Sequence, residues 1–182
     1  MDAITMIKER RSVRKYKDEK VDRETMREIV EIARWAPSWV NYQIARYTLV
    51  DDEAIIKEIA DQGVNGFVYN IDTLKTAKGV AVLSFVKGKS GTYDKEYITS
   101  KGNSWEVFDA GIACQTFCLA AHAKGVGTCI MGVIDDESIA KIVNLPEDET
   151  VAALIVYGYE DGPHQAPNKR KDVDEIMRFV DR

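Results

Sequence analysis

One stretch of this chain, residues 110–121, carries no charged side chain and lies inside a helical pattern. The pattern begins at Ser104 and ends at the Lys124–Gly125 pair, which predicts a helix of about 20 residues. The uncharged part contains Gln115 and Thr116 and is too short for a membrane span, which needs about 20 apolar residues. Such a helix needs burial on most of its surface. A small sheet can cover one side of the helix, and a two-fold-related copy of the chain could cover the other.

Helical and strand patterns are interleaved along the rest of the chain. We expect helices over residues 2–9, from Asp22 to about Pro37, and over 53–62, 135–143 and 173–180. We expect strands over 47–50, 79–86, 127–133 and 151–159. The segment 88–103 has no clear period and is the best candidate for a mobile lid or surface loop. These patterns predict one α+β domain over residues 1–182, with a small central sheet flanked by helices.

The charge balance limits the partners of the chain. Its 182 residues include 25 Lys and Arg against 30 Asp and Glu, a net charge of −5, so we expect no nucleic-acid and no membrane partner. The first 14 residues are too charged for an export signal. Three cysteines are too few for a disulfide-stapled secreted domain. We therefore expect a cytoplasmic protein whose partners are small molecules or a second copy of itself.

Two basic clusters lie near the ends of this acidic chain. In an extended backbone Arg10, Ser12 and Arg14 point the same way, which places two guanidinium groups and a hydroxyl around one phosphate. Residues 167–171 form the second cluster. A shared phosphate would offset the repulsion between the clusters. The alternative interpretation is a solvated basic turn and a solvated tail.

The loop 36–43 is rich in groups that suit a flat heteroaromatic ring. Asn41 and Gln43 offer both donors and acceptors, and Trp39 or Tyr42 could stack on a ring. The alternative is an ordinary helix-to-strand loop with its aromatic side chains packed on the core. Farther along, the backbone amides near Met131 and Gly132 are uncrowded and could donate to a ring edge.

Other motifs are weaker. The run 125–132 lacks the third glycine of a dinucleotide fingerprint, and 83–90 lacks the first glycine of a P-loop. Cys114, Cys118 and His122 share a helix face, with Cys129 as a conceivable further metal ligand, but packing explains them better and we expect no metal site. We also expect no catalytic nucleophile or acid–base side chain.

Taken in order, the motifs resemble the FMN-dependent nitroreductase family. The matching pieces span nearly the whole chain: 10–14, 36–38 with Asn41 and Gln43, 109–115, 125–128 with Gly132, and Lys169–Arg170. The resemblance implies a nitroreductase-like fold with a mostly antiparallel sheet, and an intertwined homodimer with one FMN per protomer. It also implies NADH or NADPH as the electron donor.

The resemblance also assigns cofactor-binding residues, each taken at its matching position. The phosphate would be held by Arg10, Arg11, Ser12, Arg14, Lys169 and Arg170. The isoalloxazine ring would meet Pro37, Ser38, Trp39, Asn41 and Gln43, from the same chain or from its partner, together with Asn70 and the amides of Met131 and Gly132. The family's usual Gln-Pro reads Gln43-Ile44 here, and bulky Trp39 and Tyr42 replace small residues, which suggests a narrower or more aromatic acceptor pocket.

The function expected from this resemblance is electron transfer from NAD(P)H to a flat acceptor, such as a nitroaromatic or a quinone, in a ping-pong cycle. Within the family, a reductive dehalogenase or an enoate-type reductase is the alternative. Outside it, the alternatives are a non-catalytic FMN storage or sensor protein and a cofactor-free structural dimer.

Overall fold

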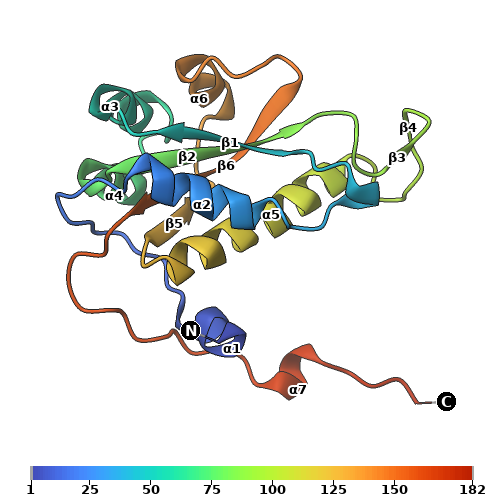
Figure 1. Ribbon diagram of the computed structural model, residues 1–182. Coiled ribbons are helices and arrows are strands. Elements are labelled where there is room, and N and C mark those ends of the chain that lie inside the picture. The colour runs from blue at the N-terminus through green and yellow to red at the C-terminus, as the bar shows by residue number, and fades with distance from the viewer. Residues whose placement is uncertain (1, 182) are drawn as a thin grey trace.

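A four-stranded antiparallel sheet forms the centre of the protein. The structure is a computed structural model that describes residues 2–181 (Figure 1). The strands are β1 (Ala45–Val50), β2 (Gly79–Val86), β5 (Gly127–Met131) and β6 (Glu149–Gly158), in the order β1-β2-β6-β5. Each neighbouring pair is antiparallel. The α+β architecture with a mostly antiparallel sheet is therefore confirmed.

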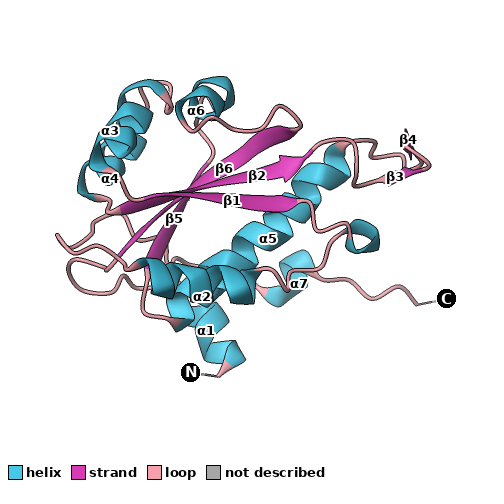
Figure 2. Ribbon diagram, turned by 45° about the horizontal axis from the view of Figure 1, so that its top comes forward, coloured by secondary structure: helices cyan, strands magenta, loops and turns pink. Residues whose placement is uncertain are grey.

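Helices cover both faces of this sheet (Figures 1 and 2). On one face lie α2 (Arg23–Ala33) and the long α5 (Ser104–Ala123); on the other lie α3 (Glu53–Gln62), α4 (Val68–Thr76) and α6 (Asp136–Ile142). Along β2, Ala81 and Leu83 join the core under α2 and α5, whereas Val80 and Val82 join the opposite core. Because the side chains of β2 alternate between two buried faces, its sequence is a nearly continuous run of apolar residues.

The expected helix starts are present. Asp2, Asp22, Asp52 and Asp135 each accept backbone N–H bonds at the start of a helix, the first of them α1 (Ala3–Glu9). Helix α4 was not predicted, because Phe67 at its N-cap makes no side-chain cap. The last helix, α7 (Val173–Ile176), is shorter than the expected 173–180, and at Met177 the backbone becomes extended.

The segment 88–103 is a surface hairpin with a fixed base. It contains β3 (Thr92–Tyr93) and β4 (Glu96–Tyr97), and it extends from the molecule beyond the N-terminal end of α5 (Figure 1). The buried Glu106 carboxylate accepts hydrogen bonds from the Gly88 N–H at 2.6 Å and the Tyr97 hydroxyl at 3.0 Å. These bonds tie the base of the hairpin to α5.

The α5 helix is buried on the sheet side and open on the other. Its buried side chains include Ala110, Cys114, Phe117, Cys118 and Ala121. On the opposite side Val107 is 60% exposed and Phe108 58%, and Gly111 is also exposed. Within the described residues, no helix is both long enough and apolar enough to cross a membrane.

Candidate functional site

The N-terminal basic run is joined to strand β5. Ser12 pairs with Thr128 in a parallel bridge, and the Val13 N–H donates to the Thr128 carbonyl at 2.9 Å. Gly127 makes this approach possible, because a Cβ at that position would lie 2.7 Å from a Val13 methyl. The motif at 125–128 therefore brings Arg10, Ser12 and Arg14 to the start of β5.

Several cationic groups of the predicted site have no anionic partner. The Arg10 side chain is half-buried, and its guanidinium makes no hydrogen bond within residues 2–181. The Arg14 guanidinium donates only to the Ser12 carbonyl, at 3.1 Å. Lys169 and Arg170 are exposed. None of the four forms an ion pair with a described residue, so all are available to an anionic ligand.

Arg11 has a different environment. Its guanidinium donates to three backbone carbonyls, those of Lys8 at 2.6 Å, Arg10 at 2.9 Å and Gln165 at 3.1 Å. Two of these carbonyls lie at the C-terminal end of α1, and the third lies on the chain that follows β6. These bonds give Arg11 a role in joining segments, and they occupy donors that a phosphate ligand would need.

The other end of β5 meets helix α4. The Asn70 side chain is 9% exposed and donates to the Val133 carbonyl at 3.0 Å, which places it beside Met131 and Gly132. A Cβ built at Gly132 would meet no atom within 4 Å, so nothing inside the protomer requires glycine there. From Thr128 to Gly132 the strand advances about 13 Å. The N-terminal run with Arg10 and Arg14 and the uncrowded Gly132 thus lie near opposite ends of one strand.

The loop 36–43 is strained and tied to α5. Val40, Asn41 and Gln43 have φ values of 45°, 56° and 50°, which is costly for a β-branched residue such as Val40. The Ser38 hydroxyl accepts the Gln43 N–H at 2.8 Å. The buried Asp109 carboxylate accepts the Trp39 N–H at 2.9 Å and also the Ser90 hydroxyl. Asp109 therefore holds the loop and the hairpin together, a role that the sequence alone did not reveal.

The two aromatic residues of this loop have different surroundings. The Trp39 ring packs 5.0 Å from that of Trp105, and its indole N–H donates to the Thr92 carbonyl at 3.2 Å. Tyr42 is 42% exposed. Trp39 is thus part of an aromatic cluster between the loop, the hairpin and α5, whereas Tyr42 is open to solvent.

The predicted site residues form two groups that lie far apart in one chain. Asp109, which holds the loop, lies near the start of α5, whereas His122, which lines a cavity with Arg10, lies near its end. These two α5 positions are separated by about 20 Å along the helix axis. The group around β5 and the group in the loop 36–43 therefore do not converge within one protomer.

The cysteines are buried in the core. A hydrogen bond to Cys118 and burial raise the pKa of the Cys114 thiol, and burial raises that of Cys129. Both thiols are therefore held protonated. In the described chain, residues 2–181, no group of three His, Cys, Asp or Glu side chains is arranged to hold a metal ion.

The fold brings Arg10 and Arg14 to the start of β5 and leaves open space beside Gly132 at its other end, an arrangement that suits an elongated ligand with an anionic end. The sequence profile of the nitroreductase family matches residues 7–159. The chain belongs to this family.

Relatives match along most of the chain. A Methanothermobacter thermautotrophicus protein named "Putative NADH dehydrogenase/NAD(P)H nitroreductase" is 28% identical over 97% of this chain and 86% of its own length. An iodotyrosine deiodinase from Thermotoga neapolitana is 26% identical over 87% of this chain and 88% of its own. The structure of an FMN-dependent nitroreductase from Clostridium difficile superposes with a TM-score of 0.77 at 28% identity, covering 97% of this chain and 98% of that one.

Proposed function

We propose that this protein is an FMN-dependent oxidoreductase that takes electrons from NADH or NADPH and passes them to a flat small-molecule acceptor, such as a nitroaromatic or a quinone. The observation that carries the proposal is that Arg10 and Arg14, which have no acidic partner among the described residues, lie near the start of β5, with Gly132 and Asn70 at its other end. The names of several relatives, which include NAD(P)H nitroreductase and FMN-dependent nitroreductase, support it.

The residues around β5 fit FMN. Arg10, Ser12 and Arg14, with Lys169 and Arg170, would hold the phosphate, because guanidinium groups bind phosphate oxygens with two parallel hydrogen bonds. Open space beside Gly132 leaves room for a ring edge, and Asn70 offers a fixed polar group next to it. When bound, FMN would supply the hydride and electron transfer chemistry.

The protein's own groups bind, orient and stabilise. Backbone amides near Met131 and Gly132 would donate hydrogen bonds to an electron-rich ring edge, which favours added negative charge there. The strained loop 36–43 would present Pro37, Ser38 and Asn41 to the ring. No side chain acts as a general acid or base in this scheme, so we assign no catalytic residue.

The separation of the two groups of site residues supports a homodimer. The loop 36–43 lies about 20 Å along α5 from the cavity that Arg10 lines, which is too far for it to contact a flavin bound in its own protomer. In a homodimer, this loop would contact the flavin of the second copy. The open face of α5, with Val107 and Phe108, supplies an apolar surface for this contact. Exposed Ile176 and Phe179 in the C-terminal segment add further apolar surface. A cytoplasmic location is still a prediction from composition.

The first test is an absorption spectrum of the purified protein, followed by anaerobic addition of NADH, then NADPH, then a nitroaromatic. We expect yellow flavin bands that bleach with a nicotinamide and return with the acceptor. Bound flavin that never bleaches would instead indicate a storage or sensor protein. If the protein neither contains nor binds FMN, the interpretation as a cofactor-free structural dimer would be favoured.

The phosphate assignment is tested by removing Arg10 and Arg14 together. We expect the Arg10→Ala/Arg14→Ala variant to lose FMN affinity about a hundredfold, because two charge-assisted contacts disappear, and to bind riboflavin nearly as well as before. Fluorescence titration with both flavins measures this difference. Equal losses for FMN and riboflavin would remove these arginines from the phosphate site.

A second candidate function is reductive dehalogenation, and the similarity to an iodotyrosine deiodinase favours it. The same anaerobic titration, with iodotyrosine in place of the nitroaromatic, tests this candidate. Reoxidation of the flavin with release of iodide would support dehalogenation, and reoxidation only by nitroaromatics or quinones would exclude it.

A further inference from the structure

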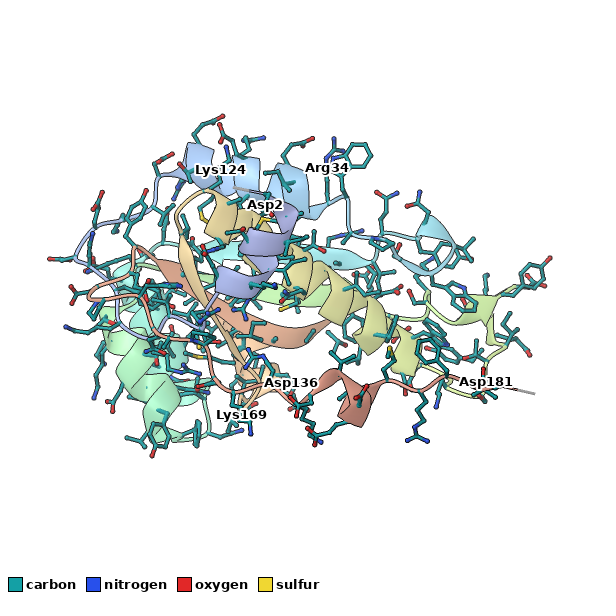
Figure 3. All side chains as sticks on the ribbon, turned by 90° about the horizontal axis from the view of Figure 1, so that it is seen from below. Asp2, Arg34, Lys124, Asp136, Lys169 and Asp181 are labelled. Atoms are coloured by element: carbon teal, nitrogen blue, oxygen red, sulfur yellow. The ribbon has the colours of Figure 1, made fainter. Side chains whose placement is uncertain are left out.

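The chain that follows β6 folds back onto the end of α1 (Figure 1). Two side chains make the contact. The His164 ring nitrogen Nε2 lies 2.8 Å from the Glu9 carbonyl, and the Arg11 guanidinium donates to the Gln165 carbonyl at 3.1 Å. The other ring nitrogen of His164, Nδ1, lies 2.8 Å from the Glu160 carboxylate. Lys169 and Arg170 follow a few residues later on the same stretch, which leads to α7 (Figure 3).

The partners of His164 define its protonation state. A backbone carbonyl can only accept a hydrogen bond, and an ionised carboxylate can only accept one. Both ring nitrogens of His164 must therefore carry a hydrogen for both contacts to form, so the complete arrangement requires the imidazolium. A neutral ring carries one N–H and can keep only one of the two bonds.

The charged groups around His164 come from three segments. Glu160 lies just after β6. The end of α1 contributes Glu9, Arg10 and Arg11. From α5, the His122 ring stacks on that of His164, with 6.3 Å between the ring centroids. Hydrogen bonds to Glu160 and to the Glu9 carbonyl raise the pKa of His164. Burial and the charge of His164 lower the pKa of His122. His164 is therefore the ring of the pair that is protonated first as the pH falls.

This contact adjoins the phosphate end of the proposed cofactor site. Arg10, Arg11, His122, Glu160 and His164 line one cavity of about 250 Å³, and Gly127 and Thr128 at the start of β5 line it as well. The segment that supplies the second basic cluster is thus anchored at the wall of the cavity that Arg10 borders.

We propose that His164, as an imidazolium, and Arg11 fasten the segment 160–170 to α1 and thereby position Lys169 and Arg170 for the FMN phosphate. This inference rests on the proposed function. It makes His164 a positioning residue, which acts on the cofactor through the chain it fastens. FMN affinity should then depend on the charge of His164, whereas riboflavin affinity should not, since riboflavin has no phosphate.

The experiment compares the ratio of FMN to riboflavin affinity in four proteins: the unchanged chain, His164→Ala, His164→Gln and Gln165→Ala. Titrations are made at about pH 6, below the ordinary histidine pKa, and at about pH 9, well above it. Gln165→Ala is the matched control, because the Gln165 side chain makes no hydrogen bond within the described residues and its backbone carbonyl is retained. Ionisation of the flavin phosphate near pH 6 affects all four alike and cancels when each variant is compared with the unchanged chain.

At about pH 6 we expect His164→Ala to lower the ratio roughly fivefold to tenfold, and Gln165→Ala to leave it unchanged. At about pH 9 the unchanged chain should approach the His164→Ala variant, because the imidazolium has lost its proton. His164→Gln can still donate one hydrogen bond to Glu9, so at about pH 6 its ratio should lie between those of the unchanged chain and His164→Ala. Relative to His164→Ala, which also has no titrating group at this position, its ratio should be the same at both pH values.

Other outcomes would overturn the inference. If the unchanged chain prefers FMN and His164→Ala keeps the same preference at both pH values, His164 does not position the phosphate ligands, and the proposed function stands. If the unchanged chain binds riboflavin as tightly as FMN, or binds neither, the phosphate site itself is wrong and the inference fails with it. A folding defect would appear as equal losses for both flavins in both His164 variants, and this too contradicts the specific role proposed.

Discussion

Arg10 and Arg11 are neighbours in sequence, yet their guanidinium groups have different surroundings. The Arg11 guanidinium donates to three backbone carbonyls, whereas the Arg10 guanidinium has no hydrogen-bond partner within residues 2–181. A half-buried guanidinium without a partner is poorly compensated, because it loses hydration without gaining an acceptor. An anionic ligand would restore that balance for Arg10. The chemistry of this part of the chain thus depends on which donors the fold leaves free.

Replacing Gly132 by alanine tests the placement of the ring edge, because this change adds a single methyl group. Since a Cβ there would meet no atom within 4 Å and the backbone is not left-handed, we expect Gly132→Ala to leave stability unchanged or to raise it by about 0.5 kcal/mol. FMN and riboflavin affinity should both fall about tenfold, because the added methyl group would crowd the ring. Thermal unfolding of flavin-free protein and flavin titration measure the two effects.

The control for this change is Ile130→Ala, which alters an exposed side chain of the same strand and adds no atom near Gly132. It should keep both flavin affinities. Unchanged flavin binding in Gly132→Ala would mean that the ring edge lies elsewhere.

Helix α5 contributes to the core and also holds two surface segments in place. Two of its buried carboxylates, Glu106 and Asp109, accept hydrogen bonds from segments that contribute little to the sheet or the main core. Buried carboxylates are stable only when hydrogen-bonded, and here the donors are the loop 36–43 and the hairpin 88–103. The first turns of α5 therefore position both segments, including the strained backbone at Val40.

Replacing Asp109 tests this role. We expect Asp109→Ala to reduce the free energy of unfolding by about 2–3 kcal/mol, because the Trp39 N–H and the Ser90 hydroxyl lose their acceptor. Asp109→Asn keeps an acceptor oxygen and should lose less than half as much. Urea unfolding measures the difference, with limited proteolysis at residues 36–43 as a local readout. Equal stability of Asp109→Ala and the unchanged chain would show that the loop is held by other contacts.

In the whole molecule, the two halves of the proposed site belong to different ends of α5. In the proposed site, one protomer supplies the groups that would bind the flavin phosphate. Its own loop 36–43 is too far away to contact that flavin. A second copy across the open face of α5 would bring a loop to each site. The same arrangement would cover the exposed Val107 and Phe108.

Gly111, on this open face, tests the homodimer. Within one protomer a Cβ at Gly111 would meet no atom within 4 Å, and glycine inside a helix costs about 1 kcal/mol relative to alanine. We therefore expect Gly111→Leu to fold as a monomer, because the new side chain would separate two packed helices. Ala54→Leu, a similar change at an exposed position of α3, should stay dimeric.

Analytical ultracentrifugation gives the oligomeric state of both variants. The Gly111→Leu monomer should also bind FMN more weakly, since the loop of the second copy is absent. A dimeric Gly111→Leu variant with unchanged FMN affinity would contradict an interface on this face of α5.

Local patterns carried much of the information in this chain. The aspartate caps, the apolar run of β2 and the stop after Ala123 are short-range features, so the helices α1, α2, α3 and α5 and the central strand could be predicted. Helix α4 has no such cap and was missed. The helix expected over 173–180 ends at Ile176, because local propensity alone does not continue it.

The sequence by itself determined which residues could bind a phosphate and a ring, because that capacity belongs to the side-chain types and to their order. Only the tertiary structure decided which of them are free and which are near one another. Arg11 is 154 positions from Gln165, and His164 is 155 positions from Glu9, so their contacts depend on the path of the whole chain. The placement of the loop 36–43 at the far end of α5 has the same origin, since it is fixed by packing between segments distant in sequence.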